Sequence, residues 1–158
     1  MMTSRELRNC LGRFATGVTV VTCDTDEEKH GFTVNSFTSV SLNPPLVLIS
    51  VDKKTKAFQF LKDNNFTVNI LKNDQQDTAM HFAGRPLEKL PFQWKKGMHC
   101  HRLQDSLAFI ECKPWAEYDG GDHVLYIGKV DHFEYGEGDA LGYYCGKFST
   151  ISGEGIET

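Results

Sequence analysis

The sequence has no apolar run long enough to cross a membrane, and its first residues, Met1 to Ser4, do not resemble a signal peptide. It also lacks the two glycine-rich nucleotide signatures, GxGxxG and GxxxxGK[S/T], so it offers neither a Rossmann nor a P-loop site. No basic excess is present, because the formal net charge is -4. This balance gives no reason to expect a nucleic acid or an anionic membrane as partner.

Disulfide patterning is absent as well. The five cysteines are an odd number and form no CxxC pair. Reduced thiols in a cytoplasmic protein fit this pattern better than a disulfide framework. No repeat, linker or low-complexity tract interrupts the 158 residues. We therefore expect a single domain over residues 1–158, long enough to bury a sizeable core.

The stretch from Gly31 to Val51 is the most informative part of the chain. Residues 46–51 are aliphatic or small and lie between two prolines and a charged turn, a pattern that predicts a buried strand. The preceding residues alternate apolar side chains with hydroxyl and amide groups: Thr33, Asn35, Ser36, Thr38, Ser39 and Ser41. Such groups are costly in a core unless a partner accepts their hydrogen bonds. A half-exposed edge strand, with these groups in water, explains the composition equally well.

Three short helices are expected outside this stretch. Thr3 and Glu6 form a capping box, and the helix that they begin should stop near Gly17. Thr55 and Asp74 are predicted N-caps of the other two, and the last of these should end at residue 84.

Strands are predicted at residues 18–23, 66–71, 107–118 and 123–135, in addition to 46–51. The segment 85–106 has no clear assignment. Strands outnumber helices, and short turns join most of them. The expected fold is therefore mainly β: an antiparallel, Greek-key-like barrel with a few α-helices packed outside.

In this order, the chain resembles the flavin reductase-like family, and more narrowly the short-chain NAD(P)H:flavin oxidoreductase components of two-component monooxygenases. The resemblance covers nearly the whole chain. Its segments are residues 13–22, 33–37, 39–41, 44–45, 66–71, 82–84, 121–123 and 146–148. It implies a flavin-binding split β-barrel, usually dimeric, and we therefore expect a homodimer. The 11 phenylalanines of a small barrel with an open pocket favour the same expectation.

A flavin ring is flat and apolar, with donors and acceptors along one edge, so its pocket needs apolar walls and a few polar groups. The alternation at Thr33, Val34, Asn35 and Ser36 supplies such groups, and Ser39 is close enough in sequence to join them. By resemblance, the segment Phe82, Ala83, Gly84 and Arg85 also lies near the flavin, although alone it is typical of a helix end.

The flavin phosphate is expected where a strand ends and a helix begins, because a helix N-terminus attracts anions. The candidates are Ser50, Lys53, Lys54, Thr55 and Lys56, and the two hydroxyl residues are preferred to the lysines. Val51, which follows Ser50, is included among the cofactor-binding residues. Taken singly, each of the three lysines of this turn is better explained as part of an exposed surface that keeps the barrel soluble.

The nicotinamide is assigned to His123 and to Gly146, Lys147 and Phe148, on the strength of the resemblance. The alternative for His123 is an ordinary turn histidine bonded to Asp122. The segment Met98–His101 has the residue types of a metal site, but no second cluster completes four ligands, and we predict no metal.

The predicted function is NAD(P)H-dependent reduction of FMN or FAD, with reduced flavin passing by diffusion to a partner monooxygenase. The hydride step requires no acid or base, so no catalytic side chain is predicted. One alternative is a flavin-carrying electron-transfer or binding protein on the same barrel. A barrel without cofactor would leave the polar stretch at 33–41 unexplained. The sequence does not distinguish FMN from FAD as the flavin, or NADH from NADPH as the cosubstrate.

Overall fold

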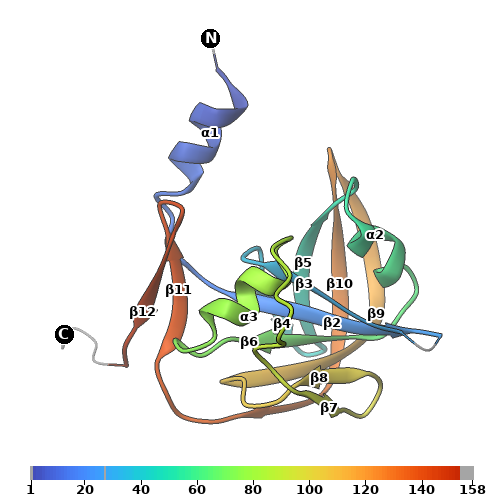
Figure 1. Cartoon of the computed structure of the whole chain (residues 1–158). Coiled ribbons are helices and arrows are strands. Elements are labelled where there is room, and N and C mark those ends of the chain that lie inside the picture. The colour runs from blue at the N-terminus through green and yellow to red at the C-terminus, as the bar shows by residue number, and fades with distance from the viewer. Residues whose placement is uncertain (1, 27, 154–158) are drawn as a thin grey trace.

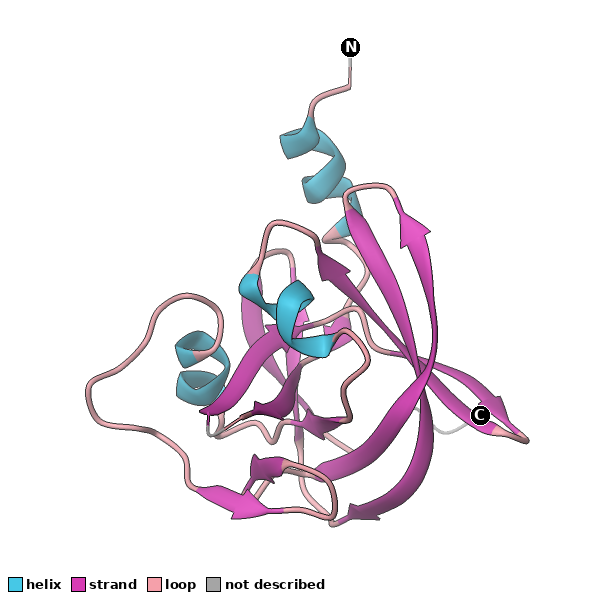
Figure 2. Ribbon diagram, turned by 90° about the vertical axis from the view of Figure 1, so that its right-hand side faces the viewer, coloured by secondary structure: helices cyan, strands magenta, loops and turns pink. Residues whose placement is uncertain are grey.

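Antiparallel strands form most of the molecule (Figure 1 and Figure 2). The structure is a computed structural model and describes residues 2–26 and 28–153. Its largest sheet has seven strands in the order β3-β2-β6-β9-β10-β5-β4. In that order the strands are Glu28–Val34, Thr19–Thr25, Phe66–Ile70, Ala108–Gly120, His123–Tyr135, Pro45–Asp52 and Thr38–Leu42.

The seven-stranded sheet curls because its two edge strands are consecutive in the sequence. Only residues 35–37 separate β3 from β4, and this link spans at most about 14 Å. A flat sheet of seven strands would be roughly 29 Å wide. The edges must therefore approach each other, and β3 contacts β5, the neighbour of β4. The result is the mainly β, antiparallel barrel that the sequence predicts.

The barrel has a core on each side of β2. Val21 and Cys23 point to one side, where they pack with Ile49 and Val68. Val20 points to the other side, into a second cluster. Because neighbouring side chains of a strand alternate between faces, burial of both faces makes β2 apolar or small at nearly every position. Each fully buried Val or Ile contributes about 1.5–3 kcal/mol.

Two small sheets cover the second core. One contains β1 (Thr16–Gly17), β11 (Ala140–Tyr144) and β12 (Lys147–Ile151), and the other contains β7 (Trp94–Lys96) and β8 (His101–Leu103). β7 and β8 lie in the segment 85–106, which has no clear pattern in the sequence because both strands have only three residues.

The first helix, α1 (Ser4–Leu11), begins at the predicted capping box between Thr3 and Glu6. It ends at Leu11, well before the predicted position near Gly17, and residues 16–17 belong to β1. In Figure 1 this helix stands away from the large sheet, beside the tip of the β11–β12 hairpin. The Cys145 N–H donates to the Gly12 carbonyl at 2.9 Å and anchors its end.

The other two helices, α2 and α3, are short, with six residues each. α2 (Lys56–Leu61) follows Thr55, as predicted, but the Thr55 side chain makes no cap hydrogen bond. α3 (Gln76–His81) follows Gln75, so the predicted cap at Asp74 is wrong. The chain leaves α3 through a turn, and Gly84 there has a φ of +88°. Among the described residues, none of the helices is both long and apolar enough to cross a membrane.

The stretch 33–41 is not one strand but the end of β3, a link and most of β4. Both strands are edges of the seven-stranded sheet, which is what the edge-strand interpretation of these hydroxyl residues requires. The long hairpin predicted near the C-terminal end is confirmed: β9 and β10 pair along their lengths and turn at Gly121 and Asp122.

A buried polar network fixes β8 against the barrel. The side-chain amide of Asn69, fully buried, donates to the Val20 carbonyl at 2.9 Å and accepts from the Leu103 N–H at 3.0 Å. His101 at the start of β8 is bonded to Asp24 at 2.9 Å. Satisfied buried polar groups of this kind specify one arrangement of the strands.

All five cysteines are free thiols. Burial raises the pKa of Cys23 and of Cys112 to about 12, and that of Cys100 to about 11. These three thiols stay protonated at neutral pH, because the apolar interior disfavours the thiolate. They are therefore packing groups rather than nucleophiles.

Candidate functional site

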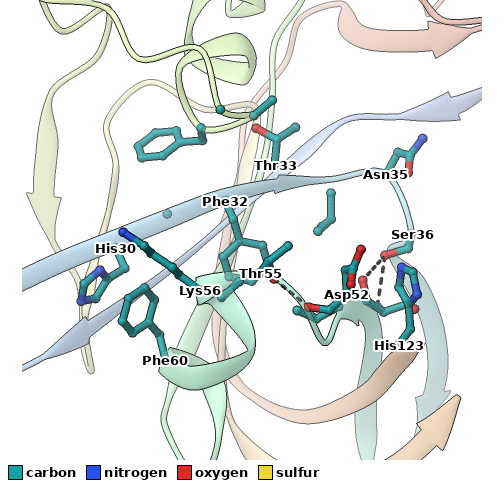
Figure 3. Close-up of a pocket in the computed structure, with 18 of the residues that line it drawn as sticks. His30, Phe32, Thr33, Asn35, Ser36, Asp52, Thr55, Lys56, Phe60 and His123 are labelled. Carbon is teal, nitrogen blue, oxygen red and sulfur yellow. Dashed lines mark hydrogen bonds between the residues drawn. The ribbon is translucent and has the colours of Figure 1, made fainter. Parts of the chain in front are cut away.

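A cleft of about 990 Å³ lies along β3 (Figure 3). Its walls are β3, the end of β5, the start of α2 and the turn that follows α3. Phe32, Val34 and Phe82 supply apolar surface, while Asn35 and Ser36 add polar groups. This mixture suits a flat apolar ligand with one polar edge.

A second cleft of about 690 Å³ meets the first. Thr33, Val34, Asn35 and Ala83 line both clefts. The far wall of the second cleft comes from β11 and from the start of β12. The end of β3 therefore separates two adjoining binding volumes, so ligands in both would lie close to each other.

Most of the residues predicted to form the site line these clefts. Eleven of them line the first cleft: Thr33, Val34, Asn35, Ser36, Ser50, Val51, Thr55, Phe82, Ala83, Gly84 and His123. Four others line the second: Arg85, Gly146, Lys147 and Phe148. The last two, Ser39 and Lys54, line neither.

The positions of Ser39 and Lys54 in the fold explain why they lie outside both clefts. Ser39 pairs with Val47 within the outer strand β4 and is exposed. The backbone N–H of Lys54 donates to the Asp52 carboxylate at 2.9 Å, in a turn that leaves this lysine exposed. Nearness in sequence therefore did not bring either side chain into the cleft.

Thr33 holds the end of α3 against β3. Its hydroxyl donates to the Ala79 carbonyl at 2.6 Å, and its backbone N–H donates to the Phe82 carbonyl at 3.3 Å. These bonds use the polar groups of Thr33 within the protein. Within the described residues, by contrast, neither Asn35 nor Ser36 donates its backbone N–H to another protein group. These two amides remain available to a ligand.

Ser36 closes the gap between the two edges of the sheet. Its hydroxyl donates to the Ser50 carbonyl at 3.0 Å and accepts from the Ser50 N–H at 3.1 Å. A single side chain thus replaces the pair of backbone hydrogen bonds that a neighbouring strand would form. The hydroxyl of Ser50 itself has no hydrogen-bond partner among the described residues, and it lies on the wall of the cleft.

The turn between β5 and α2 uses most of its polar groups internally. The Thr55 hydroxyl donates to the Asp52 carbonyl at 2.8 Å. Lys53 forms an ion pair with Asp119 and lowers the pKa of that exposed carboxyl, chiefly through the hydrogen bond between them. Of the three lysines here, only Lys56 lines the cleft.

His123 lies in the first cleft, whereas the other predicted nicotinamide residues lie in the second. It is paired across the sheet with Asp52, and Figure 3 shows the two beside Ser36. Its Nδ1 is bonded to Asp122 at 2.8 Å, a bond that lowers the pKa of Asp122. The structure therefore separates His123 from Phe148, which the prediction grouped as one subsite.

Several residues of the first cleft were not predicted from the sequence, among them His30, Phe32, Asp52 and Phe60. The alternation of β3 was a usable signal, since it extends the face of Val34 back through Phe32 to His30. Phe60 had no such signal. It enters the cleft from α2, and only the tertiary packing of that helix beside β3 places it there.

The histidines of the segment 98–101 are each bonded to a carboxylate. His99 contacts Asp131 at 2.5 Å and His101 contacts Asp24 at 2.9 Å. In residues 2–26 and 28–153, no three His, Cys, Asp or Glu side chains are arranged to hold a metal ion.

Comparison with known proteins places this chain in a family. Residues 11–152 match the family described as "Flavin reductase like domain". The chain is 38% identical over 156 residues to an NADH-dependent flavin reductase of a Rhodococcus species, covering 95% of this chain and 88% of that one. It is 40% identical over 139 residues to the reductase component of 4-hydroxyphenylacetate 3-monooxygenase of Thermus thermophilus, covering 87% and 89%. It spans only 48% of the length of two other relatives.

The solved structure of the flavin reductase PheA2 superimposes with a TM-score of 0.91 at 40% identity, covering 96% of this chain and 99% of that one. The chain is therefore a member of the flavin reductase-like family. This membership confirms the resemblance seen in the sequence and the split-barrel fold that it implies.

A substitution at Gly31 tests whether close packing of β3 against the α3 turn builds the first cleft. A Cβ atom at Gly31 would lie 2.6 Å from the ring of Phe82, and Phe92 and Trp94 pack against that ring. We expect Gly31→Ala to lower the free energy of unfolding by about 1–3 kcal/mol, as measured by urea denaturation.

Gly17→Ala is the matched control, because a Cβ at Gly17 meets nothing within 4 Å. Its stability should stay within about 0.5 kcal/mol of the parent. Equal stability of the two variants would show that the Phe82 contact is not tight.

Proposed function

We propose that the protein is an NADH-dependent flavin reductase that supplies reduced flavin to a partner monooxygenase. The observation that carries this proposal is the meeting of two clefts at the end of β3, in a chain of the flavin reductase-like family. Relatives named as an NADH-dependent flavin reductase and as a monooxygenase reductase component support the cosubstrate and the partner.

The residues of the first cleft fit a flavin. The free backbone N–H groups of Asn35 and Ser36 suit the acceptors on the polar edge of the ring, and Val34 with Ala83 suits its apolar body. The Ser50 hydroxyl, which has no hydrogen-bond partner among the described residues, is a donor for the phosphate. Thr55 also lines the cleft, but its hydroxyl already donates to the Asp52 carbonyl. We assign the nicotinamide to the second cleft, beside Lys147 and Phe148.

A flavin held by these residues would supply the redox chemistry, by accepting a hydride from the nicotinamide. The protein contributes binding and alignment, since such a transfer needs the reacting atoms about 3–3.5 Å apart. The bonds from Thr33 to α3 and from Ser36 to β5 hold the walls of the clefts in place. Alignment of two ligands is thus the function that these side chains perform.

An assay of turnover tests the proposal. Purified protein should bind flavin stoichiometrically in a fluorescence titration, and it should oxidise NADH steadily when free FMN or FAD is added. Flavin binding without NADH oxidation would favour the alternative, an electron-transfer or binding protein on the same barrel. Absence of flavin binding would refute both.

A second prediction concerns the phosphate. Ser50→Ala should weaken flavin binding by about tenfold, the effect of losing one hydrogen bond to a charged group. Stability should change little, because the Ser50 hydroxyl makes no hydrogen bond within residues 2–26 and 28–153. The dissociation constant from flavin fluorescence measures the effect.

Ser39→Ala provides the control, as a serine outside both clefts, and its affinity should stay within about twofold of the parent. Equal affinities of the two variants would place the phosphate elsewhere.

We also infer a homodimer. Three apolar side chains of the N-terminal arm and of the edge strand β4 are mostly exposed in the single chain: Leu11 at 62%, Phe14 at 79% and Leu42 at 95%. Exposed apolar groups in this number favour a protein partner. Sedimentation equilibrium at micromolar concentration should give about twice the chain mass of 17.8 kDa. A mass equal to that of one chain would contradict the dimer.

A cytoplasmic location is supported by the five free thiols, since secreted proteins rarely keep so many. Fractionation of the source cells, followed by immunoblotting, tests it.

A further inference from the structure

The first cleft continues beyond the positions assigned to the flavin ring and its phosphate. Its remaining end is formed by His30 on β3 and Phe60 on α2, whose rings stack with centroids 3.6 Å apart and an interplanar angle of 14°. His30 is held in place by a hydrogen bond between its Nε2 and the Thr25 hydroxyl. The two rings form a fixed aromatic wall (Figure 3).

Cationic side chains accompany this wall. Lys29 and Lys56 both line the cleft, and Figure 3 shows Lys56 reaching from α2 toward β3 beside the stacked rings. The nearest carboxylate of this end, Glu28, is 3.8 Å from His30, and its side chain is 81% exposed. The other acid of the cleft, Asp52, lies at the opposite end, beside His123.

The dimensions of the first cleft leave room for a ligand longer than a mononucleotide. From His30 to Val34 the strand rises by roughly 13 Å, and Ser36 and Ser50 lie beyond Val34. The cleft volume of about 990 Å³ is at the upper limit of ordinary small-molecule sites, about 300–1,000 Å³. FMN ends at its phosphate and would leave the His30–Phe60 end to water.

We propose that the His30–Phe60 end binds the adenylate half of FAD, so that this protein selects FAD over FMN. A purine stacks on aromatic side chains because its face is flat and polarisable. The second phosphate of FAD adds negative charge, which Lys56 and Lys29 attract. This inference rests on the proposed flavin function, and it extends that function by naming the flavin.

Titration of the protein with FAD and with FMN, followed by flavin fluorescence, tests the proposal. The parent should bind FAD at least tenfold more tightly than FMN. Phe60→Leu keeps an apolar side chain against the core but removes the aromatic face. It should lose about tenfold in FAD affinity, while its FMN affinity stays within about twofold. Phe60→Trp restores an aromatic face and should retain the FAD preference.

Lys56→Gln gives an independent test, because this exposed side chain makes no hydrogen bond or ion pair within the described residues. It should lower FAD affinity about threefold to fivefold and leave FMN affinity unchanged. Lys62→Gln, at the other end of α2 and outside the cleft, is the matched control and should change neither affinity.

Equal affinity of the parent for FAD and FMN would overturn the inference. It would also be overturned if Phe60→Leu and Lys56→Gln each lost FAD affinity and FMN affinity to the same extent. In these cases flavin binding persists and the proposed function stands. If the parent binds neither flavin, the proposed function fails and the FAD subsite fails with it. Thermal unfolding of each variant shows whether a loss of affinity reflects a loss of folded protein.

Discussion

The link of three residues between β3 and β4 is the constraint on which the rest of the structure depends. It joins the two edges of a seven-stranded sheet, so the sheet can form only if it curls. Curling brings one face of every strand inward and buries residues such as Val21 and Ile49. It also leaves the barrel split, because β3 and β4 continue along the chain instead of pairing with each other. The hydroxyl of Ser36, bonded to both backbone groups of Ser50, closes this split with one side chain.

The same split creates the site. An edge strand has backbone donors and acceptors on one side that no neighbour uses. Along β3 some of these groups bind the α3 turn, as at Thr33, and the amides of the link that follows remain free. α2 and α3 cannot fill the space beside the edge, because each is only six residues long. The open edge of the sheet, which is a liability in most β proteins, is here the place where two clefts meet.

A second face of the sheet is covered by β8. This strand lies against β2 and β6 and is fixed by the buried amide of Asn69 and by the pair of His101 with Asp24. Burial keeps the thiols of Cys23, Cys100 and Cys112 protonated. This packing supports β3, and the alignment of two ligands proposed above depends on such support.

Periodicity in the sequence determined the strands and the barrel class, because the alternation of side chains on a strand is local and visible in any one segment. Local chemistry likewise determined the capping box of α1 and indicated the cleft residues at the end of β3 and in the turn between β5 and α2. The predicted residues in 82–85, 123 and 146–148 came instead from the resemblance to the family. The short strands β7 and β8 were not predicted from the sequence, because they have too few residues to show a period. Tertiary structure alone decided which polar groups are free for a ligand and which are used by the protein, as Ser50 and Thr33 illustrate. It also separated His123 from Phe148 and brought Phe60 to His30, since distances between segments far apart in the chain depend on how the whole sheet curls.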